Sequence, residues 1–128
     1  TLGVRAVVTN GRGEILLVQH KDDGVFYLVG GGVKKGETLV EAIIRETREE
    51  CGICLSELRC ASVYTNFQEY KNDHIAVFTA KSDGEVMPGR ELISAGYYPP
   101  GNLPEPLSKG MKRRIDEYNA GVFSCGKW

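Results

Sequence analysis

Three glutamates, Glu46, Glu49 and Glu50, stand close together in a segment with helical spacing. At about 100° per residue they fall within about 100° of one helix face, so their carboxylates point the same way. Like charges on one stripe repel, and the helix gains no stability from this arrangement. Clustered carboxylate oxygens suit Mg²⁺ or Mn²⁺, cations that also engage substrate phosphates. The stripe is therefore either a metal site or a solvated acidic face partnered by Arg45 and Arg48.

The residues just before this segment favour the metal site. A short apolar strand, 26–29, runs directly into Gly30, Gly31 and Gly32. Because glycine has no Cβ, its backbone carbonyl and amide groups can approach a metal ion or a phosphate closely. The sequence holds 16 glycines in 128 residues, well above the usual share of about 7%. A glycine loop for metal and phosphate explains part of that excess.

The helix that carries the glutamates has clear ends in the sequence. Thr38 is followed three residues later by Glu41, a pattern typical of a capping box. An apolar stripe then recurs at helical spacing, made up of Leu39, Ala42, Ile43, Thr47 and Cys51. Gly52 follows, as glycine often does just past the end of a helix. We therefore predict a helix over residues 39–51.

The remaining pattern predicts one α/β domain over residues 1–128. Strands are predicted at 2–9, 14–20, 26–29, 58–67, 73–80 and 92–98, and a last helix from about 106 to 118. The apolar face expected for that last helix consists of Leu107, Met111, Ile115 and Tyr118. The first two strands flank a glycine-containing turn and are expected to form a hairpin. With no long linker and no internal repeat, we expect a mixed sheet with a helix on each side.

Segment 31–53 resembles the Nudix box, G-x5-E-x7-R-E-U-x-E-E-x-G-U, in which U is a bulky aliphatic residue. All seven fixed positions match: Gly31, Glu37, Arg45, Glu46, Glu49, Glu50 and Gly52. Two positions depart from the family pattern. Thr47 replaces an aliphatic residue, although its methyl group can still pack, and Val29 replaces a proline, which loosens the fixed φ of the loop. The resemblance implies a Nudix-type α/β/α sandwich, a mixed β-sheet flanked by helices.

The resemblance also implies an activity. Nudix hydrolases use water to attack phosphorus in a nucleoside diphosphate linked to another group, as in nucleoside triphosphates, nucleotide sugars and ADP-ribose. Residue by residue, Glu46, Glu49 and Glu50 would bind Mg²⁺ (or Mn²⁺) together with the Gly30 carbonyl. Elementary chemistry agrees, because a hydroxide cannot approach the pyrophosphate until divalent cations neutralise its charge. The implied partner is a small nucleotide-type substrate.

The family pattern assigns supporting roles as well. Arg45 would orient the catalytic carboxylates, and Glu37 would hold Arg45 and the loop. Glu46 or Glu49 is the preferred general base. In this family the base can lie outside the box, and four other residues are conceivable: Glu69, Asp73, His74 and Glu91.

Two residues outside the box are candidates for contacting the substrate. Arg5 lies on an otherwise apolar strand, and a guanidinium in that position usually has an anion partner, either a carboxylate or a substrate phosphate. Tyr70 lies in a polar loop and could stack on a nucleobase. The four cysteines are expected to be buried or half-buried thiols of a reducing cytoplasm.

Composition excludes several other classes of protein. Sixteen Lys and Arg against 17 Asp and Glu give a net charge of -1, which argues against a sequence-specific nucleic-acid protein with a basic coat. The basic group Lys109, Lys112, Arg113 and Arg114 is interpreted as a solvated helix face. No apolar run approaches the ~20 residues of a membrane helix, and no charged-then-apolar leader opens the sequence, so a cytoplasmic protein is expected. A homodimer is possible.

Two rival interpretations remain. The first is a Nudix-like module that senses or binds a nucleotide without cleaving it. The intact Arg-Glu-x-x-Glu-Glu run of residues 45–50 argues against this, because such modules tend to lose metal ligands. The second is a structural α/β domain with an acidic surface helix, which would make seven matched positions an accident.

Overall fold

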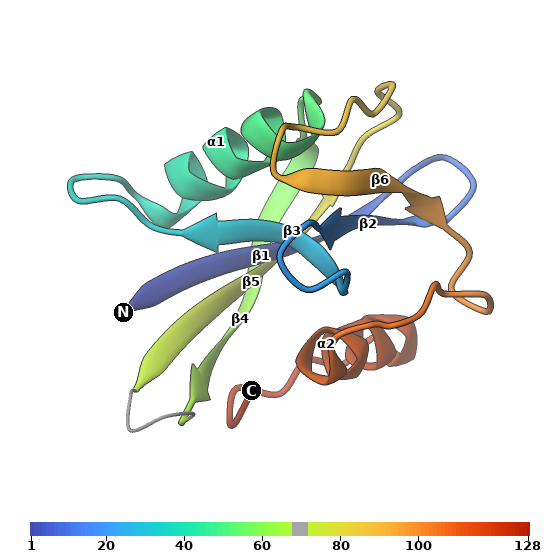
Figure 1. Ribbon diagram of the computed structural model, residues 1–128. Helices are drawn as coiled ribbons and strands as arrows, with labels where there is room; N and C mark the ends of the chain where they lie inside the picture. Colours follow the sequence, from blue (N-terminus) through green and yellow to red (C-terminus); the bar gives the residue numbers. More distant parts are fainter. Residues whose placement is uncertain (68–71) are drawn as a thin grey trace.

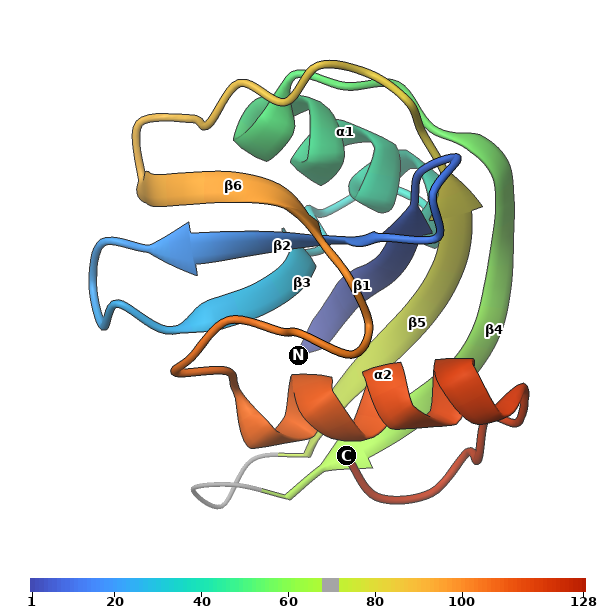
Figure 2. The ribbon, with the colours of Figure 1, turned by 90° about the vertical axis from the view of Figure 1, so that its right-hand side faces the viewer.

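Six strands form one mixed sheet, and a helix packs on each of its two faces (Figures 1 and 2). The computed structural model describes residues 1–67 and 72–128. The elements are β1 (Leu2–Thr9), β2 (Ile15–His20), β3 (Phe26–Gly32), α1 (Leu39–Cys51), β4 (Ser56–Asn66), β5 (Asp73–Lys81), β6 (Leu92–Tyr98) and α2 (Lys109–Ala120). The predicted α/β sandwich is therefore confirmed, and each predicted element is present.

The strand order corrects one expectation. The order is β4-β5-β1-β3-β2-β6, with β1 and β5 parallel and the other neighbours antiparallel. The expected hairpin of β1 and β2 is wrong, because β3 lies between them and they meet only at the pair Thr9 and Ile15. β3 pairs with β1 through Arg5 and Gly30 and with β2 through Leu17 and Leu28. The glycines of β3 are consequently inside the sheet, next to β1.

The sheet separates two apolar cores. Along β1, Val4, Ala6 and Val8 face the core that α1 covers, whereas Val7 faces the core that α2 covers. This alternation follows from the two-residue period of a strand. Ile43 of α1 is fully buried in the first core, a burial that stabilises the fold by about 1.5–3 kcal/mol. Each helix therefore has a fixed position over the sheet (Figure 2).

α1 has the ends that its sequence predicts. The Thr38 hydroxyl accepts a hydrogen bond from the Glu41 amide at 3.1 Å, and the Glu41 carboxylate accepts one from the Thr38 amide at 2.9 Å. Gly52 ends the helix with a φ of 68°, a left-handed conformation that favours glycine. Thr47, at the aliphatic position of the box, is fully buried, and its hydroxyl donates to the Ile43 carbonyl at 2.7 Å. The hydroxyl is thus satisfied while the methyl group packs.

α2 begins three residues later than predicted. Pro106 and Leu107 lie alongside β3, where the Phe26 amide donates to the Pro106 carbonyl at 2.8 Å. The Ser108 amide in turn donates to the Phe26 carbonyl at 3.0 Å. Because their backbone groups pair with β3, these residues cannot form the first turn of a helix. Leu107 still packs into the core under α2, as its apolar character suggests.

Arg114 contradicts the predicted solvated face of α2. Its side chain is 3% exposed and lies over the Tyr64 ring at 3.9 Å and the Trp128 ring at 5.0 Å. Its Nε is 2.7 Å from a carboxylate oxygen of Glu117. The other three basic residues, Lys109, Lys112 and Arg113, are exposed as predicted. Rings from β4 and from the segment after α2 form the burial site, and neither is near Arg114 in sequence.

The cysteines are also more exposed than expected. Cys51 is buried, and burial raises the pKa of its thiol to about 12. Cys54, Cys60 and Cys125 are exposed, and all four thiols are free. Cys60 lies on β4, an edge strand of the sheet, and Cys54 follows the end of α1.

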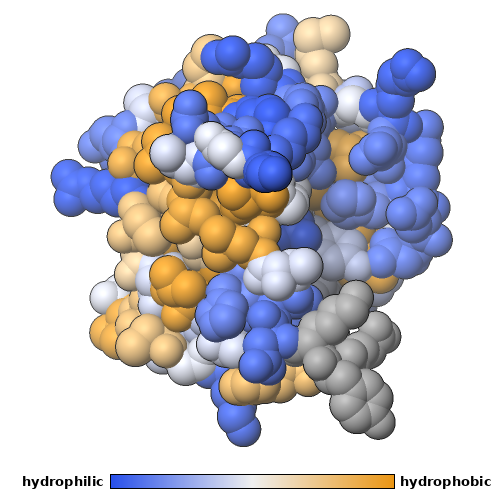
Figure 3. Space-filling model, turned by 90° about the vertical axis from the view of Figure 1, so that its left-hand side faces the viewer, coloured by the Kyte–Doolittle hydropathy of each residue, from blue (hydrophilic) through white to orange (hydrophobic). Residues whose placement is uncertain are grey.

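Some apolar side chains remain at the surface. Figure 3 shows apolar side chains gathered in the centre of the face seen from the left of Figure 1. Large apolar residues exposed on β1, α1 and β4 include Leu2, Val40, Ile44 and Val63, at 39–47%. No helix in the described ranges 1–67 and 72–128 is long and apolar enough to cross a membrane.

Candidate active site

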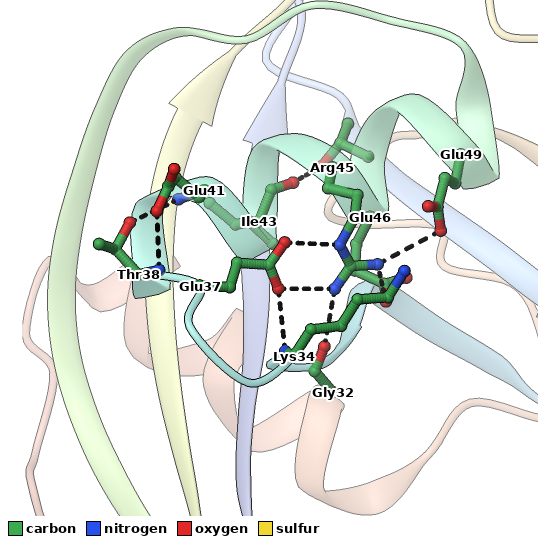
Figure 4. Close-up of polar contacts among 10 residues, drawn as sticks. Gly32, Lys34, Glu37, Thr38, Glu41, Ile43, Arg45, Glu46 and Glu49 are labelled. Carbon is green, nitrogen blue, oxygen red and sulfur yellow. Dashed lines mark hydrogen bonds and ion pairs between the residues drawn. The ribbon is translucent and has the colours of Figure 1, made fainter.

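Arg45 of α1 joins its helix to the loop that follows β3 (Figure 4). Its Nε donates to Glu37 Oε2 at 2.6 Å and its Nη2 donates to Glu37 Oε1 at 2.9 Å. The same Nη2 donates to the Gly32 carbonyl at 3.0 Å. Bidentate pairing of this kind fixes the plane of the guanidinium as well as its position. Arg45 therefore holds both the start and the end of the loop between β3 and α1.

Glu37 is anchored on its other side by the loop itself. The Lys34 amide donates to Glu37 Oε1 at 2.9 Å. The hydrogen bonds from Arg45, followed by that from Lys34, lower the pKa of Glu37 to about 2. Glu37 is therefore ionised at any physiological pH and remains a permanent partner of Arg45.

Arg45 also gathers two of the three glutamates in the stripe. Its Nη1 donates to Glu46 Oε1 at 2.9 Å and to Glu49 Oε2 at 3.3 Å (Figure 4). The two carboxylates differ in environment, since the Glu46 side chain is 17% exposed and that of Glu49 is 55% exposed. One guanidinium nitrogen thus orients a sheltered carboxylate and an open one. Glu46 and Glu49 carry two negative charges, and the one positive charge of Arg45 is also shared with Glu37. The cluster therefore has an excess of negative charge.

Two of the three glycines of β3, Gly30 and Gly31, are in close contact with neighbouring atoms. A Cβ at Gly31 would lie 2.7 Å from the carboxylate carbon of Glu46, so a larger residue would push that carboxylate out of its place. A Cβ at Gly30 would lie 2.0 Å from the Val4 carbonyl oxygen, and Gly30 has a φ of 151°. Val29, at the usual proline position, pairs with Ala6 of β1, and β3 continues through it to the glycines.

Glu50 faces the sheet and not Arg45. Its Oε1 accepts a hydrogen bond from the Gly30 amide at 3.0 Å, and its side chain is 13% exposed. Burial raises the pKa of Glu50 to about 7, against the Gly30 hydrogen bond and the charge of Arg5. The charges of Glu46 and Glu91 raise this pKa further. Glu50 is a sheltered carboxylate with only partial compensation, an environment that a bound cation would relieve.

Arg5 is directed toward the same carboxylates. Its Nη1 donates to the Leu28 carbonyl at 2.9 Å, and its guanidinium lies 5.5 Å from the Tyr27 ring centroid. Burial lowers the pKa of Arg5, whereas the charges of Glu50 and Glu46 raise it. Of the two anion partners that the sequence left open, the carboxylates of Glu50 and Glu46 act on Arg5 through their charge, while its hydrogen bond goes to a backbone carbonyl. A substrate contact by Arg5 remains a prediction.

Sequence reasoning did not single out His20 and Tyr27 for this site. His20 Nε2 lies 3.9 Å from Glu50 Oε2, and the His20 ring meets the Tyr27 ring edge-on at 4.9 Å. A signal was present in the strand period, because His20 is two residues after the buried Val18 and shares its face. The missing information was that this end of β2 lies next to the end of α1.

The other candidate bases have varied positions. Asp73 lies at the start of β5 and pairs with the Thr1 amino group at 3.6 Å, and the His74 amide donates to the Thr1 carbonyl at 3.0 Å. Glu91 is close enough to Glu50 for its charge to act on the Glu50 pKa. Glu69 and Tyr70 lie outside the described residues.

The carboxylates are not arranged as a closed metal cage. Within residues 1–67 and 72–128, no three His, Cys, Asp or Glu side chains converge as a metal-binding group. The contacts explain this, since Glu46 and Glu49 turn to Arg45 while Glu50 turns to the Gly30 amide. The donor set nevertheless fits a hard divalent cation, because all three ligands are carboxylate oxygens on one helix face. Gly31 leaves the space for Glu46 that such a site needs.

Carboxylates held by an arginine above a glycine-containing strand form a site suited to a cation and a phosphate. The chain belongs to the Nudix family, since the family model described as NUDIX domain matches residues 1–118. The resemblance carried by segment 31–53 is thereby confirmed. The chain is a Nudix hydrolase, a class of enzyme that acts on pyrophosphate bonds.

Similar sequences include several named enzymes. A Bacillus subtilis (strain 168) protein, provisionally named an 8-oxo-dGTP diphosphatase, is 31% identical over 95% of this chain and 82% of its own length. An ADP-ribose pyrophosphatase of Methanocaldococcus jannaschii is 32% identical over 82% of this chain and 65% of its own length. An NAD-capped RNA hydrolase, NudC, of Photorhabdus laumondii is 40% identical over 80% of this chain. The chain spans only 41% of the length of that NudC.

Solved structures agree on the fold. A MutT Nudix hydrolase from Burkholderia pseudomallei superimposes with a TM-score of 0.79 at 25% identity, over 90% of this chain and 95% of that one. The Nudix domain of Shewanella oneidensis NrtR, crystallised with ADP ribose, superimposes with a TM-score of 0.80 at 17% identity, over 94% and 86%. The second likeness shows the fold alone.

Proposed function

We propose that this protein is a divalent-metal-dependent pyrophosphohydrolase that cleaves a nucleoside diphosphate linked to another group, by attack of water on phosphorus. The observation that carries the proposal is the contact between Arg45 Nη1 and the carboxylates of Glu46 and Glu49 directly above Gly31. A structural acidic helix has no need for a glycine under a glutamate or for three crowded carboxylates. Both features are useful if a cation and a phosphate occupy this face.

Each side chain has a role in this proposal. Glu46, Glu49 and Glu50 would hold Mg²⁺ or Mn²⁺ together with the Gly30 carbonyl. Bound metal would neutralise the pyrophosphate and lower the pKa of a coordinated water. Glu46 or Glu49 would accept the proton of the attacking water, with Arg45 fixing the direction of both carboxylates. Glu37 would keep Arg45 in place.

The substrate is proposed from the chemistry that the relatives' names share. 8-Oxo-dGTP, ADP-ribose and NAD-capped RNA each contain a nucleoside joined to a pyrophosphate. The test is a panel of nucleoside triphosphates including 8-oxo-dGTP, nucleotide sugars, ADP-ribose and NAD-capped RNA, with Mg²⁺ and with Mn²⁺. We expect hydrolysis of at least one compound, and product identification locates the broken bond. No turnover of any compound with either metal would reject the proposal.

A second candidate is a module that binds a nucleotide without cleaving it. Such a module would have the same fold as the Nudix domain of Shewanella oneidensis NrtR, whose structure contains ADP ribose. Binding of ADP-ribose measured by calorimetry, combined with no hydrolysis over the panel, would support this candidate. Turnover of any substrate that depends on Glu49 would exclude it.

A further inference from the structure

The Tyr27 ring lies at the centre of a set of contacts beside Glu50. The His20 ring meets it edge-on, with centroids 4.9 Å apart and planes at 88°. The Arg5 guanidinium carbon lies 5.5 Å from the ring centroid, within the range of a cation–π interaction. The Tyr27 hydroxyl donates to Asp23 Oδ2 at 2.5 Å. One ring therefore contacts two cationic or basic side chains and is itself held at its far end.

The two groups that Tyr27 contacts both act on Glu50. His20 Nε2 lies 3.9 Å from Glu50 Oε2. Arg5 pairs with Gly30 between β1 and β3, and the Gly30 amide donates to Glu50 Oε1 at 3.0 Å. Within residues 1–67 and 72–128, the Glu50 carboxylate accepts one hydrogen bond, which comes from the Gly30 amide. The position of this carboxylate therefore depends on β3 and on the neighbouring side chains of His20 and Arg5.

The strand pairing explains how one residue reaches both groups. Tyr27 pairs with Val18 of β2, so His20, two residues further on, is its diagonal neighbour on the same face. The next residue, Leu28, supplies the carbonyl that accepts the Arg5 hydrogen bond at 2.9 Å. Gly30, on the same strand, donates to Glu50. Residues 27–30 of β3 thus include a contact to each of His20, Arg5 and Glu50.

We propose that Tyr27 is a positioning residue for the metal site: its ring, anchored by Asp23, holds Arg5 and His20 beside Glu50 and so directs that carboxylate. The proposal rests on the function proposed above, in which Glu50 is a metal ligand. Tyr27 itself need not touch the metal ion or the substrate. Residues that orient metal ligands typically change metal affinity or activity by about 10–100-fold when they are lost.

Tyr27→Leu is the principal test, with Tyr98→Leu as its matched control. Tyr98 is also half-buried on a strand and meets Phe26 edge-on at 5.8 Å, but it packs into the core under α2. Mn²⁺ affinity is measured by electron paramagnetic resonance, which requires no substrate, and kcat and KM are measured on the substrate that the panel identifies. We expect Tyr27→Leu to weaken Mn²⁺ binding and lower kcat by about 10-fold or more. Tyr98→Leu should lower the melting temperature while leaving both values within about twofold of wild type.

Two milder variants keep the proposal testable if Tyr27→Leu does not fold. Tyr27→Phe and Asp23→Ala both remove the hydrogen bond between Tyr27 and Asp23, and Asp23→Ala also removes the one that the Val25 amide donates to Asp23 Oδ1. Both should weaken Mn²⁺ binding in the same direction as Tyr27→Leu, by about threefold, because the ring remains but loses its anchor. Agreement between the two variants would support the positioning role.

The outcomes separate this proposal from the proposed function. If folded Tyr27→Leu has wild-type Mn²⁺ affinity and kcat, the positioning role is overturned. A change in KM alone would also overturn it, because it would indicate that Tyr27 contacts the substrate and does not position Glu50. Wild-type protein that binds no Mn²⁺ and hydrolyses no substrate would overturn the proposed function instead. If the wild type binds Mn²⁺ but hydrolyses nothing, the Mn²⁺ comparison still decides the role of Tyr27.

Discussion

Two arginines lie at the centres of polar clusters on opposite faces of the sheet, and their surroundings differ. Arg114 of α2 is 3% exposed, stacked on two rings, and paired with one carboxylate, Glu117. Arg45 of α1 is 19% exposed and bonded to Glu37, Glu46 and Glu49. The first cluster balances one positive and one negative charge. The second has an excess of negative charge.

The carboxylates of the two clusters also differ, in their hydrogen bonds and in their exposure to solvent. Both oxygens of Glu117 are occupied: Oε1 accepts from the Tyr64 hydroxyl at 2.8 Å, and Oε2 accepts from the Ser124 amide and hydroxyl at 3.1 and 2.7 Å. Although burial opposes it, these hydrogen bonds keep the pKa of Glu117 below its ordinary value. Glu49, in contrast, has a side chain that is 55% exposed. A satisfied cluster contributes to stability, and an under-neutralised one is available for a ligand.

The largest expected effect comes from Glu49→Gln, which removes the charge of a proposed metal ligand from the Arg45 cluster. We expect kcat to fall by about 10²–10³-fold, the range for losing one charge-stabilising group. The melting temperature should stay close to that of wild type, because the side chain is exposed. Steady-state kinetics and thermal denaturation measure the two effects.

Glu117→Gln is the matched change in the Arg114 cluster, where both oxygens of the carboxylate accept hydrogen bonds. It should lower the melting temperature, because one carboxylate oxygen, an acceptor, is replaced by an amide NH2 group that faces other donors. Its kcat should remain at the wild-type value. A loss of kcat in Glu117→Gln, or a loss of stability alone in Glu49→Gln, would reverse the roles that we give to the clusters.

Arg45→Lys should have the next largest effect. Lysine retains the charge but cannot bond both oxygens of Glu37 in one plane while also reaching Glu46 and Glu49. We expect kcat to fall by about 10–100-fold, as for other residues that orient metal ligands. Arg48→Lys, an exposed change on the same helix, is the control and should leave kcat unchanged.

Arg114→Met removes the arginine of the same cluster and leaves Glu117 in place. Methionine fills a similar volume but loses the ion pair with Glu117 and the stacking on Tyr64 and Trp128. We expect the free energy of unfolding to fall by about 1–3 kcal/mol, the range for removing one partner of a buried polar pair. Urea denaturation measures this quantity. An unchanged midpoint would show that the buried arginine is not needed for stability.

The smallest expected effect is a pH dependence of the metal-free protein. The folded state raises the pKa of Glu50 from its ordinary value of 4.5 to about 7, so it binds the proton more tightly than the unfolded state does. This contribution to stability is complete below pH 4.5 and is lost as the pH rises through 7. The melting temperature should therefore include a fall of a few degrees over this window, which Glu50→Gln abolishes.

Local signals in the sequence predicted some parts of the molecule well. The limits of α1 follow from Thr38, Glu41 and Gly52, which act within a few residues of one another. The family pattern indicated that Arg45 and Glu37 would meet, and the structure brings them to 2.6 Å. Their catalytic roles remain predictions.

Contacts between distant segments could not be predicted in this way. The predicted start of α2 was wrong because the backbone of residues 106–108 pairs with Phe26, which lies about 80 residues earlier in the chain. Arg114 is buried by Tyr64 and Trp128, which no helical periodicity reveals. The insertion of β3 between β1 and β2 similarly depends on the whole sheet. For the same reason, Tyr27 and His20 emerged as neighbours of Glu50 only in the structure.

The central claim is that the carboxylates on α1 bind the divalent cation used for hydrolysis. Mn²⁺ binding followed by electron paramagnetic resonance in wild type, Glu49→Gln and Glu117→Gln tests this claim most directly. We predict that Glu49→Gln weakens Mn²⁺ binding by at least about 10-fold, whereas Glu117→Gln binds Mn²⁺ as wild type does. Equal affinity of wild type and Glu49→Gln, or no Mn²⁺ binding by the wild type, would contradict the account.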